Sequence, residues 1–201
     1  PSAAPAVCRT VPAGRRRCHR KAKSMQFETL KEIIDFAIAR GKEGEWVLQM
    51  DLAPGRDQVA VVRYDTEAEV PCRLTNARAV IAAAIRNLTS RSGTHIDEGL
   101  RLALAELQSP RHLERNASVI VLLTDGVQTG TPGEELRAAD EVRAADVRLY
   151  TIGLGGDADA AALREMAGDD SRYHFAPDSA DLARIYAEIA SDILCPAPAG
   201  G

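Results

Sequence analysis

The stretch Ser118-Val-Ile-Val-Leu-Leu-Thr124, followed at once by Asp125-Gly126, decides the fold. Its apolar residues are consecutive, which is typical of a strand that is covered on both faces of a parallel sheet. Asp125 and Gly126 mark its end. A strand of this kind requires helices on both sides of the sheet, and the patterns in the rest of the chain supply them.

Strand and helix patterns alternate on either side of this stretch. Short apolar runs predict strands at 58–64, 70–74, 147–154 and 173–175. Amphipathic patterns predict helices at 77–88, 95–108, 134–145, 158–167 and 179–194, and a further helical stripe runs from Met25 to Leu52. Pro71 marks its strand as an edge strand. The alternation predicts a three-layer α/β domain with a mostly parallel sheet and helices on both faces.

Length and composition indicate one globular domain. The chain has 201 residues, of which 45% are hydrophobic and 27% are charged, values that are ordinary for a soluble domain with a core of its own. No window approaches the roughly 18 apolar residues of a transmembrane segment. We expect the domain to span residues 24–195, with a flexible tail at 196–201.

The first 23 residues differ from the rest in charge. They contain seven Lys and Arg and no acid, whereas the remaining chain carries 18 basic and 29 acidic side chains. We expect a disordered arm over 1–23 without a specific nucleic-acid partner, because it lacks aromatic residues and helical spacing of its charges. No apolar stretch follows these charges, so no secretory signal is visible. The sequence leaves the compartment and the oligomeric state open.

The four cysteines do not indicate a zinc site. Cys8, Cys18, Cys72 and Cys195 lack the paired close spacing of zinc ligands. Cys8 and Cys195 lie near the two ends and are candidates for a disulfide in an exported protein, with free thiols as the alternative.

Two polar residues stand where ligands of such folds bind, at the carboxyl ends of the strands. Asp125 directly follows the most buried strand, and Thr94 follows a glycine in a polar loop. A hydroxyl and a carboxylate that face one cavity are hard oxygen ligands, which suit Mg²⁺ or Ca²⁺ better than zinc or copper.

These residues carry a family resemblance. The segments 92–100 (Ser-Gly-Thr-His-Ile-Asp-Glu-Gly-Leu), 119–126 (Val-Ile-Val-Leu-Leu-Thr-Asp-Gly) and 148–155 (Arg-Leu-Tyr-Thr-Ile-Gly-Leu-Gly) resemble the von Willebrand factor A (vWA) domain family. The likeness runs from about Ser24 to Leu194. It implies a Rossmann-like fold with a metal-ion-dependent adhesion site. Such a site holds a divalent cation, usually Mg²⁺, with Mn²⁺ or Ca²⁺ as alternatives, and an acidic side chain of a protein partner fills its open position.

The resemblance also assigns residues to the site. The family pattern has an Asp-x-Ser-x-Ser loop after the central strand, a Thr in a second loop and an Asp in a third. By position, Ser24 matches the last serine, Thr94 the threonine and Asp125 the aspartate. The first serine falls on Ala22 and the leading aspartate on Arg20, whose guanidinium would repel a cation.

The departure extends upstream of the metal motif. Residues 13–19 contain Arg, Gly and Cys in place of an apolar run, so we expect the central first strand to be missing or disrupted and the cation site to be impaired. An alternative places that strand and motif at 46–55. It is disfavoured, because the motif should precede a helix, whereas 58–64 is a strand. Arg-, Ala-, Pro- and Cys-rich sequence is typical of GC-rich coding out of frame, so we interpret residues 1–23 as a frame-shifted or spliced remnant, with native sequence as the alternative.

The function expected from the sequence is protein–protein interaction of the adhesion type, without catalysis. No nucleophile–base pair is assembled and no glycine-rich phosphate loop follows a strand. Two alternatives stay open: a metal-assisted α/β hydrolase or phosphoryl-transfer enzyme, and a vWA-like scaffold that binds without metal. The resemblance allows an extracellular or cell-surface location.

Overall fold

The computed structural model describes residues 5–12, 52, 54–88, 93–177 and 179–194. In chain order the elements are β1 (Pro5–Pro12), β2 (Gln58–Tyr64), β3 (Ala68–Thr75), α3 (Arg78–Arg86), α4 (Ile96–Leu107), β4 (Asn116–Thr124), α5 (Glu134–Ala144), β5 (Arg148–Leu154), α6 (Ala160–Ala167), the short 3-10 helix η1 (Asp170–Arg172), β6 (Tyr173–Ala176) and α7 (Ser179–Leu194). From residue 58 onward, each predicted strand and helix is present. The helix predicted from Met25 lies outside the described residues. None of the described helices is long and apolar enough to cross a membrane.

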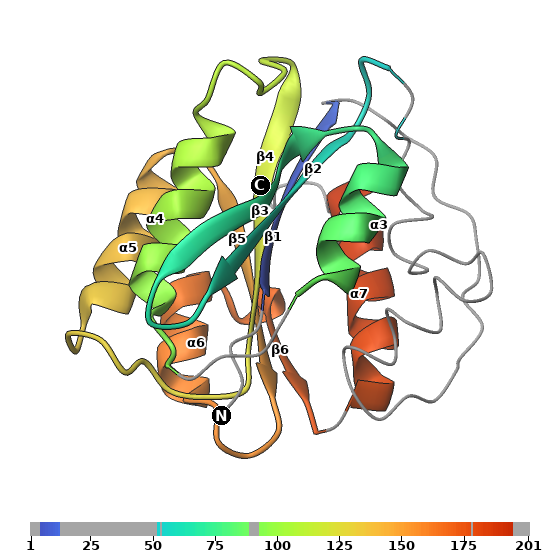
Figure 1. Ribbon diagram of the computed structural model, residues 1–201. Helices are drawn as coiled ribbons and strands as arrows, with labels where there is room; N and C mark the ends of the chain where they lie inside the picture. The colour runs from blue at the N-terminus through green and yellow to red at the C-terminus, as the bar shows by residue number, and fades with distance from the viewer. Residues whose placement is uncertain (1–4, 13–51, 53, 89–92, 178, 195–201) are drawn as a thin grey trace, which may run out of the picture.

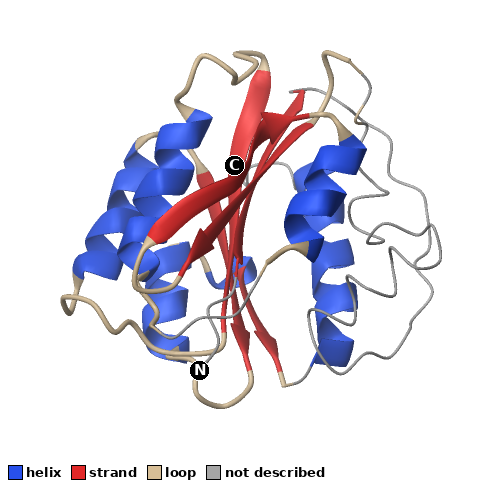
Figure 2. Ribbon diagram, in the orientation of Figure 1, coloured by secondary structure: helices blue, strands red, loops and turns tan. Residues whose placement is uncertain are grey.

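The six strands form one sheet in the order β3-β2-β1-β4-β5-β6. β4, β5 and β6 pair in parallel, β3 is an antiparallel edge strand beside β2, and β1 runs antiparallel to both β2 and β4. β2, β4, β5 and β6 therefore point in the same direction. Helices α4, α5 and α6 cover one face of the sheet, and α3 and α7 cover the other (Figures 1 and 2). This is the three-layer α/β architecture that the sequence predicts.

The central strand corrects one expectation. Residues 5–12, which we expected to belong to a disordered arm, form β1 between β2 and β4. A strand therefore occupies the centre of the sheet, but it runs antiparallel to both of its neighbours. The physical reason is that β2 and β4 would otherwise each leave a row of backbone N–H and C=O groups without partners. Val7, Thr10 and Val11 are β-branched and favour extended structure. Residues 13–19, which the family pattern places before the metal motif, lie outside the described residues.

The core is divided between the two faces of β4. Ile120 and Leu122 pack with residues of α4, α5 and α6, whereas Val119, Val121 and Leu123 pack with α7. All five side chains are at most 5% exposed. This alternation explains why β4 is apolar at consecutive positions, as the sequence analysis supposed.

Small side chains bring the helices close to one another. Ala103 of α4 and Ala138 and Ala139 of α5 are fully buried in the same cluster. With few aromatic residues in the chain, the core is filled by aliphatic side chains in close-packed layers. The tight packing of α4 against α5 fixes the two loops that precede these helices.

Candidate functional site

The loops of Thr94 and Asp125 meet at one edge of the sheet. Asp125 directly follows β4 and is partly buried, and Thr94 directly precedes His95 and α4 and is 2% exposed. The backbone N–H of His95 donates to the carbonyl of Asp65, just beyond the end of β2, at 2.8 Å. Since β2 and β4 end at the same edge, the structure places both sequence-predicted residues at the carboxyl edge.

A pair of hydrogen bonds joins these two loops directly. The backbone N–H of Thr94 donates to Oγ1 of Thr129 at 2.8 Å, and the backbone N–H of Thr129 donates to the carbonyl of Thr94 at 3.0 Å. We call this reciprocal pair the Thr94–Thr129 clasp. Thr129 lies in the loop that Asp125 begins, so the clasp fixes the position of one predicted ligand loop relative to the other.

Gln128 adds a second connection at the start of α4. Its Oε1 accepts a hydrogen bond from the backbone N–H of Ile96 at 2.7 Å, and its Nε2 donates to Oδ1 of Asp97 at 2.6 Å. His95, at the N-cap position, makes no side-chain capping bond within the described chain. Gln128 therefore accepts a hydrogen bond from one of the first backbone N–H groups of α4, which have no partner within the helix. The sequence analysis missed this residue, because a cap supplied from 32 positions away leaves no local signal.

Gly93 is required for the approach of the Thr94 loop to the β2–β3 turn. Its φ is +99°, and a Cβ at this position would lie 2.5 Å from Cγ2 of Thr66 and 3.0 Å from the Thr66 backbone nitrogen. Side chains other than glycine rarely adopt such a φ, and a methyl group would overlap the neighbouring turn. The glycine thus places Thr94 beside the end of β2.

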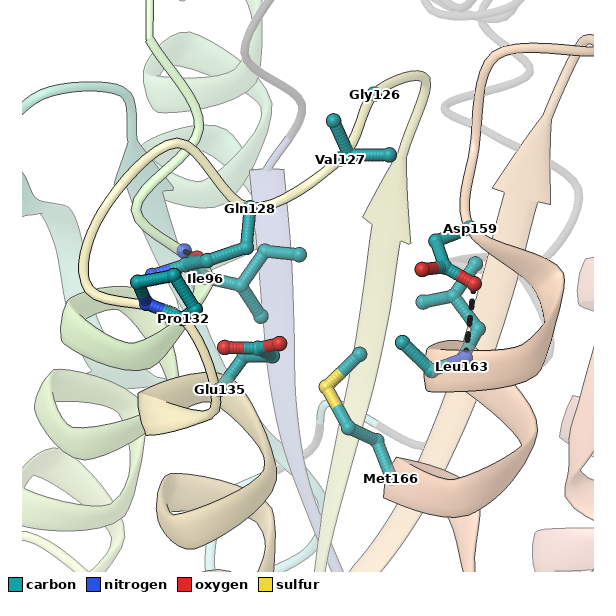
Figure 3. Close-up of a pocket in the computed structure, with 10 residues that line it drawn as sticks. Ile96, Gly126, Val127, Gln128, Pro132, Glu135, Asp159, Leu163 and Met166 are labelled. Atoms are coloured by element: carbon teal, nitrogen blue, oxygen red, sulfur yellow. Dashed lines mark hydrogen bonds between the residues drawn. The ribbon is translucent and has the colours of Figure 1, made fainter.

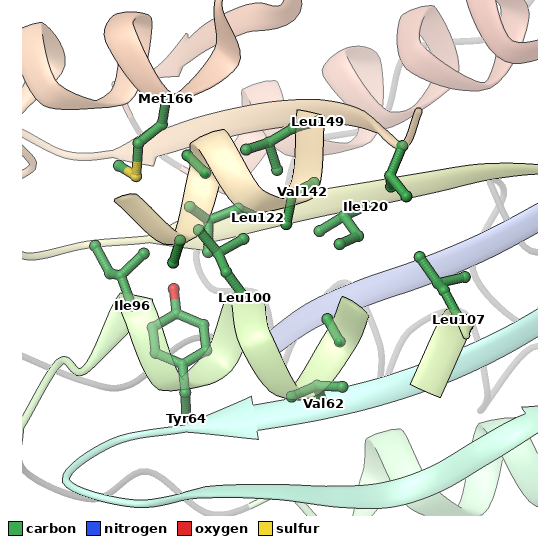
Figure 4. Packing of buried hydrophobic residues seen from close by; sticks show 14 of the residues in the cluster. Val62, Tyr64, Ile96, Leu100, Leu107, Ile120, Leu122, Val142, Leu149 and Met166 are labelled. Atoms are coloured by element: carbon green, nitrogen blue, oxygen red, sulfur yellow. The ribbon is translucent and has the colours of Figure 1, made fainter. Parts of the chain in front are cut away.

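Tyr64 is a buried side chain near Asp125. Its fully buried hydroxyl donates to the carbonyl of Leu123, and its ring packs in the cluster with Ile96 and Leu100 (Figure 4). Burial raises the pKa of Tyr64; a hydrogen bond with Thr124 counteracts this rise, and the negative charge of Asp125 adds to it. Tyr64 is therefore a neutral donor at physiological pH, and the Asp125 carboxylate lies near enough to affect it.

The chemistry of the donors at this edge fits Mg²⁺. The Thr94 hydroxyl and the Asp125 carboxylate are hard oxygen donors, and Mg²⁺ is commonly held by one or two carboxylates together with water. Among the described residues, no group of three His, Cys, Asp or Glu side chains is arranged to hold a metal ion. Ser24, the third predicted ligand, and Arg20 lie outside the described residues.

The direction of β1 bears on the first family loop. In β1, Ala6 pairs with Leu122 near the end of β4, and Pro12 pairs with Asn116 at its start. β1 therefore ends at the edge opposite Thr94 and Asp125. The central strand does not lead into the candidate site, and this part of the family pattern is disrupted, in line with the departure that Arg20 and Ala22 indicate.

A mixed sheet covered by helices on both faces, with a hydroxyl and a carboxylate at its carboxyl edge, defines a class of three-layer α/β domains with a candidate cation site. The family model of the von Willebrand factor type A domain matches residues 22–188. The chain belongs to this family.

Relatives and solved structures agree with this assignment. The human collagen alpha-6(VI) chain is 28% identical over 169 residues, which cover 81% of this chain and 7% of the relative. The chain spans a quarter or less of the length of the curated relatives it matches.

Two of the similar solved structures contain a metal. Proximal thread matrix protein 1 of the mussel byssus, with a zinc-occupied metal-ion-dependent adhesion site, has a TM-score of 0.66 and 22% identity over 78% of this chain and 40% of its own. Manganese-loaded TRAP of Plasmodium vivax has a TM-score of 0.60 and 18% identity over 71% of this chain and 61% of its own. At these identities the likeness establishes the fold.

Proposed function

We propose that this chain is a protein-interaction module and that its binding surface is the carboxyl edge formed by the loops of Thr94 and Asp125. The observation that carries the proposal is the Thr94–Thr129 clasp, which holds the loops of the two family-pattern ligands together at 2.8 and 3.0 Å. Membership of the vWA family and the collagen relative support it. The collagen and byssus relatives also favour an extracellular location for this protein, which fractionation of the source cells tests.

Thr94, Asp125 and Ser24 would together hold the cation, with Mg²⁺ as the expected ion and Mn²⁺ or Ca²⁺ as alternatives. When bound, the ion supplies an open coordination position that suits an acidic side chain of a partner. The chain's own residues prepare this position: Asp125 contributes negative charge, and the clasp orients the backbone that carries the Thr94 hydroxyl. Arg20 replaces the leading aspartate of the pattern, so we expect weak binding.

Calorimetric titration with Mg²⁺ and Mn²⁺ tests the metal site. We expect saturable heat with the unmodified chain and none with Asp125→Asn, which keeps the shape of the side chain and removes its charge. Asp157→Asn is the matched control, because Asp157 is an exposed carboxylate after β5. The metal proposal is wrong if no heat is released, or if Asp125→Asn and Asp157→Asn bind equally well.

We further propose that the module binds without catalysing a reaction. The two alternatives give different outcomes. A metal-assisted hydrolase would turn over p-nitrophenyl phosphate in Mg²⁺, and Asp125→Asn would abolish that activity. A metal-independent scaffold would keep its partner in EDTA, whereas the proposed module would release it.

A further inference from the structure

A small cavity lies beside the candidate metal site and is separate from it. It has a volume of about 110 Å³ and opens between the β4–α5 loop and the first turns of α5 and α6 (Figure 3). The apolar part of its wall is formed by Ile96, Val127, Pro132, Ala162, Leu163 and Met166. Val127 is half exposed, with 50% of its surface accessible. The cavity is therefore accessible from the surface, and its wall combines hydrocarbon with polar groups.

One carboxyl group points into this cavity. Glu135, in the first turn of α5, is 9% exposed, and its side chain lies between Pro132 and Met166 (Figure 3). Its Oε2 is buried and accepts no hydrogen bond from any described residue. Burial of a carboxylate oxygen without a donor or a cation costs free energy, so Glu135 is an unusual residue to retain here unless something meets it.

The charged and polar side chains around Glu135 pair with other residues. Glu134 pairs with Arg101 at 2.7 Å and with Arg137 at 2.7 Å on the outer surface. Both arginines therefore pair with Glu134, the neighbour of Glu135. Gln128, which also lines the cavity, already uses its amide on Ile96 and Asp97. Arg101, Arg137 and Gln128 therefore each have partners other than Oε2 of Glu135.

A second carboxylate contributes negative charge to the cavity wall. Asp159 lines the cavity and is the N-cap of α6, where its Oδ1 accepts hydrogen bonds from the backbone N–H groups of Ala161 and Ala162, both at 3.0 Å. These bonds fix the orientation of the side chain. Two carboxylates beside a group of apolar side chains favour a ligand that combines a positive charge with hydrocarbon.

We propose that this cavity binds a primary alkylammonium group, with Glu135 as its counter-ion. The methylene stem would pack against Ile96 and Met166, and the ammonium group would donate to Oε2 of Glu135. An ammonium ion is a compact point charge that can donate to a single carboxylate oxygen, whereas a guanidinium fork prefers both oxygens of a carboxylate. A hydrated Mg²⁺ ion fits less well, because Ile96, Leu163 and Met166 give its water molecules no partners.

Either a lysine side chain of a protein partner or a free amine would supply this chemistry. The inference does not depend on the proposed metal site, because it requires none of Ser24, Thr94 and Asp125. A test with small amines needs neither a metal nor a partner, so failure of one proposal leaves the other intact.

NMR titration of the isotope-labelled chain with n-butylammonium, in the presence of EDTA, tests the cavity. We expect a dissociation constant on the order of 1 mM, as for small ligands of a few heavy atoms, with shift changes around Val127 and Ala162. Glu135→Gln should weaken binding roughly tenfold, the effect of losing one charge-assisted hydrogen bond. Glu134→Gln is the matched control on the same helical turn and should leave binding unchanged.

Two further measurements complete the test. Asp159→Asn retains the helix cap, since Asn and Asp cap equally well, and its loss of charge should weaken binding less than Glu135→Gln does. Titration with Nα-acetyl-lysine methylamide distinguishes a lysine side chain from a free amine as the ligand. Binding as tight as that of butylammonium assigns the site to a lysine side chain. Weaker binding assigns it to a free amine. The proposal is overturned if neutral n-butanol binds as tightly as butylammonium, or if Glu135→Gln binds butylammonium normally.

Discussion

Replacement of Gly93 by alanine tests whether the Thr94 loop depends on its close approach to the β2–β3 turn. The new Cβ would lie 2.5 Å from Cγ2 of Thr66, 3.0 Å from the Thr66 nitrogen and 3.3 Å from the Asp65 carbonyl carbon. Two of these atoms belong to the backbone and cannot rotate away. A positive φ costs an alanine about 1–2 kcal/mol, and overlap of this kind costs about 1–3 kcal/mol. We expect a total loss of roughly 2–5 kcal/mol in the free energy of unfolding.

Gly155→Ala is the matched control for this substitution. Gly155 also has a positive φ, +71°, but no described atom lies within 4 Å of the Cβ that alanine would add. Both substitutions reduce the freedom of the unfolded chain equally, so this contribution cancels in the comparison. The difference between the two variants therefore isolates the overlap with Thr66, and we expect it to be about 1–3 kcal/mol.

Urea unfolding followed by far-UV circular dichroism, at one pH and with the unmodified chain alongside, measures both variants. Equal losses for Gly93→Ala and Gly155→Ala would refute the reasoning, because they would mean that the loop moves away from Thr66 at no cost. If Gly93→Ala lowers the free energy of unfolding while the slope of this free energy against urea concentration is unchanged, the effect lies in the folded state.

Two other contacts give predictions about stability. Glu106 is 5% exposed and accepts hydrogen bonds from Arg111 and from the backbone of Leu74, each at 2.8 Å. Burial alone would raise the pKa of Glu106, but these bonds outweigh burial and lower the pKa. The contribution of Glu106 to stability is therefore complete above the ordinary Glu pKa of about 4.3. It is lost as the pH falls through the lower pKa of the folded state. Glu106→Gln should flatten the acid limb of unfolding free energy against pH, and an unchanged limb would contradict this. Gln128→Ala leaves the N–H of Ile96 without its cap, and should cost about 1–2 kcal/mol in urea unfolding; a loss as small as that of an exposed Gln→Ala change would exclude the cap.

The periodic patterns of the sequence predict most of the fold. β2 and α7 have the bounds that apolar spacing indicates, and β3 is the edge strand that Pro71 suggests. These elements are predictable because the burial of a strand or helix face leaves a repeating trace in the residues of that element. The family resemblance adds the positions of Thr94 and Asp125, which the structure brings to one edge.

The features that the sequence analysis missed are set by distant parts of the chain. β1 is stabilised by backbone groups of β2 and β4, so no apolar run in the sequence predicts it. Gln128 caps a helix in another segment, and Glu135 resembles any acidic residue in the first turn of a helix until the β4–α5 loop covers it. In each case the neighbours that give the residue its role are brought close only by the tertiary fold.

The β4–α5 loop has a further consequence, since it belongs to both proposed sites. Thr129 holds the Thr94 loop through the clasp, and Val127 and Gln128 of the same short segment line the cavity of Glu135. Movement of this segment by one ligand would be felt at the other site. Thermodynamic linkage then requires reciprocity: whatever factor a cation at the Thr94 and Asp125 edge applies to amine affinity, the amine must apply to cation affinity. The loop would make the domain a coincidence detector, responsive to two unlike chemical groups presented together.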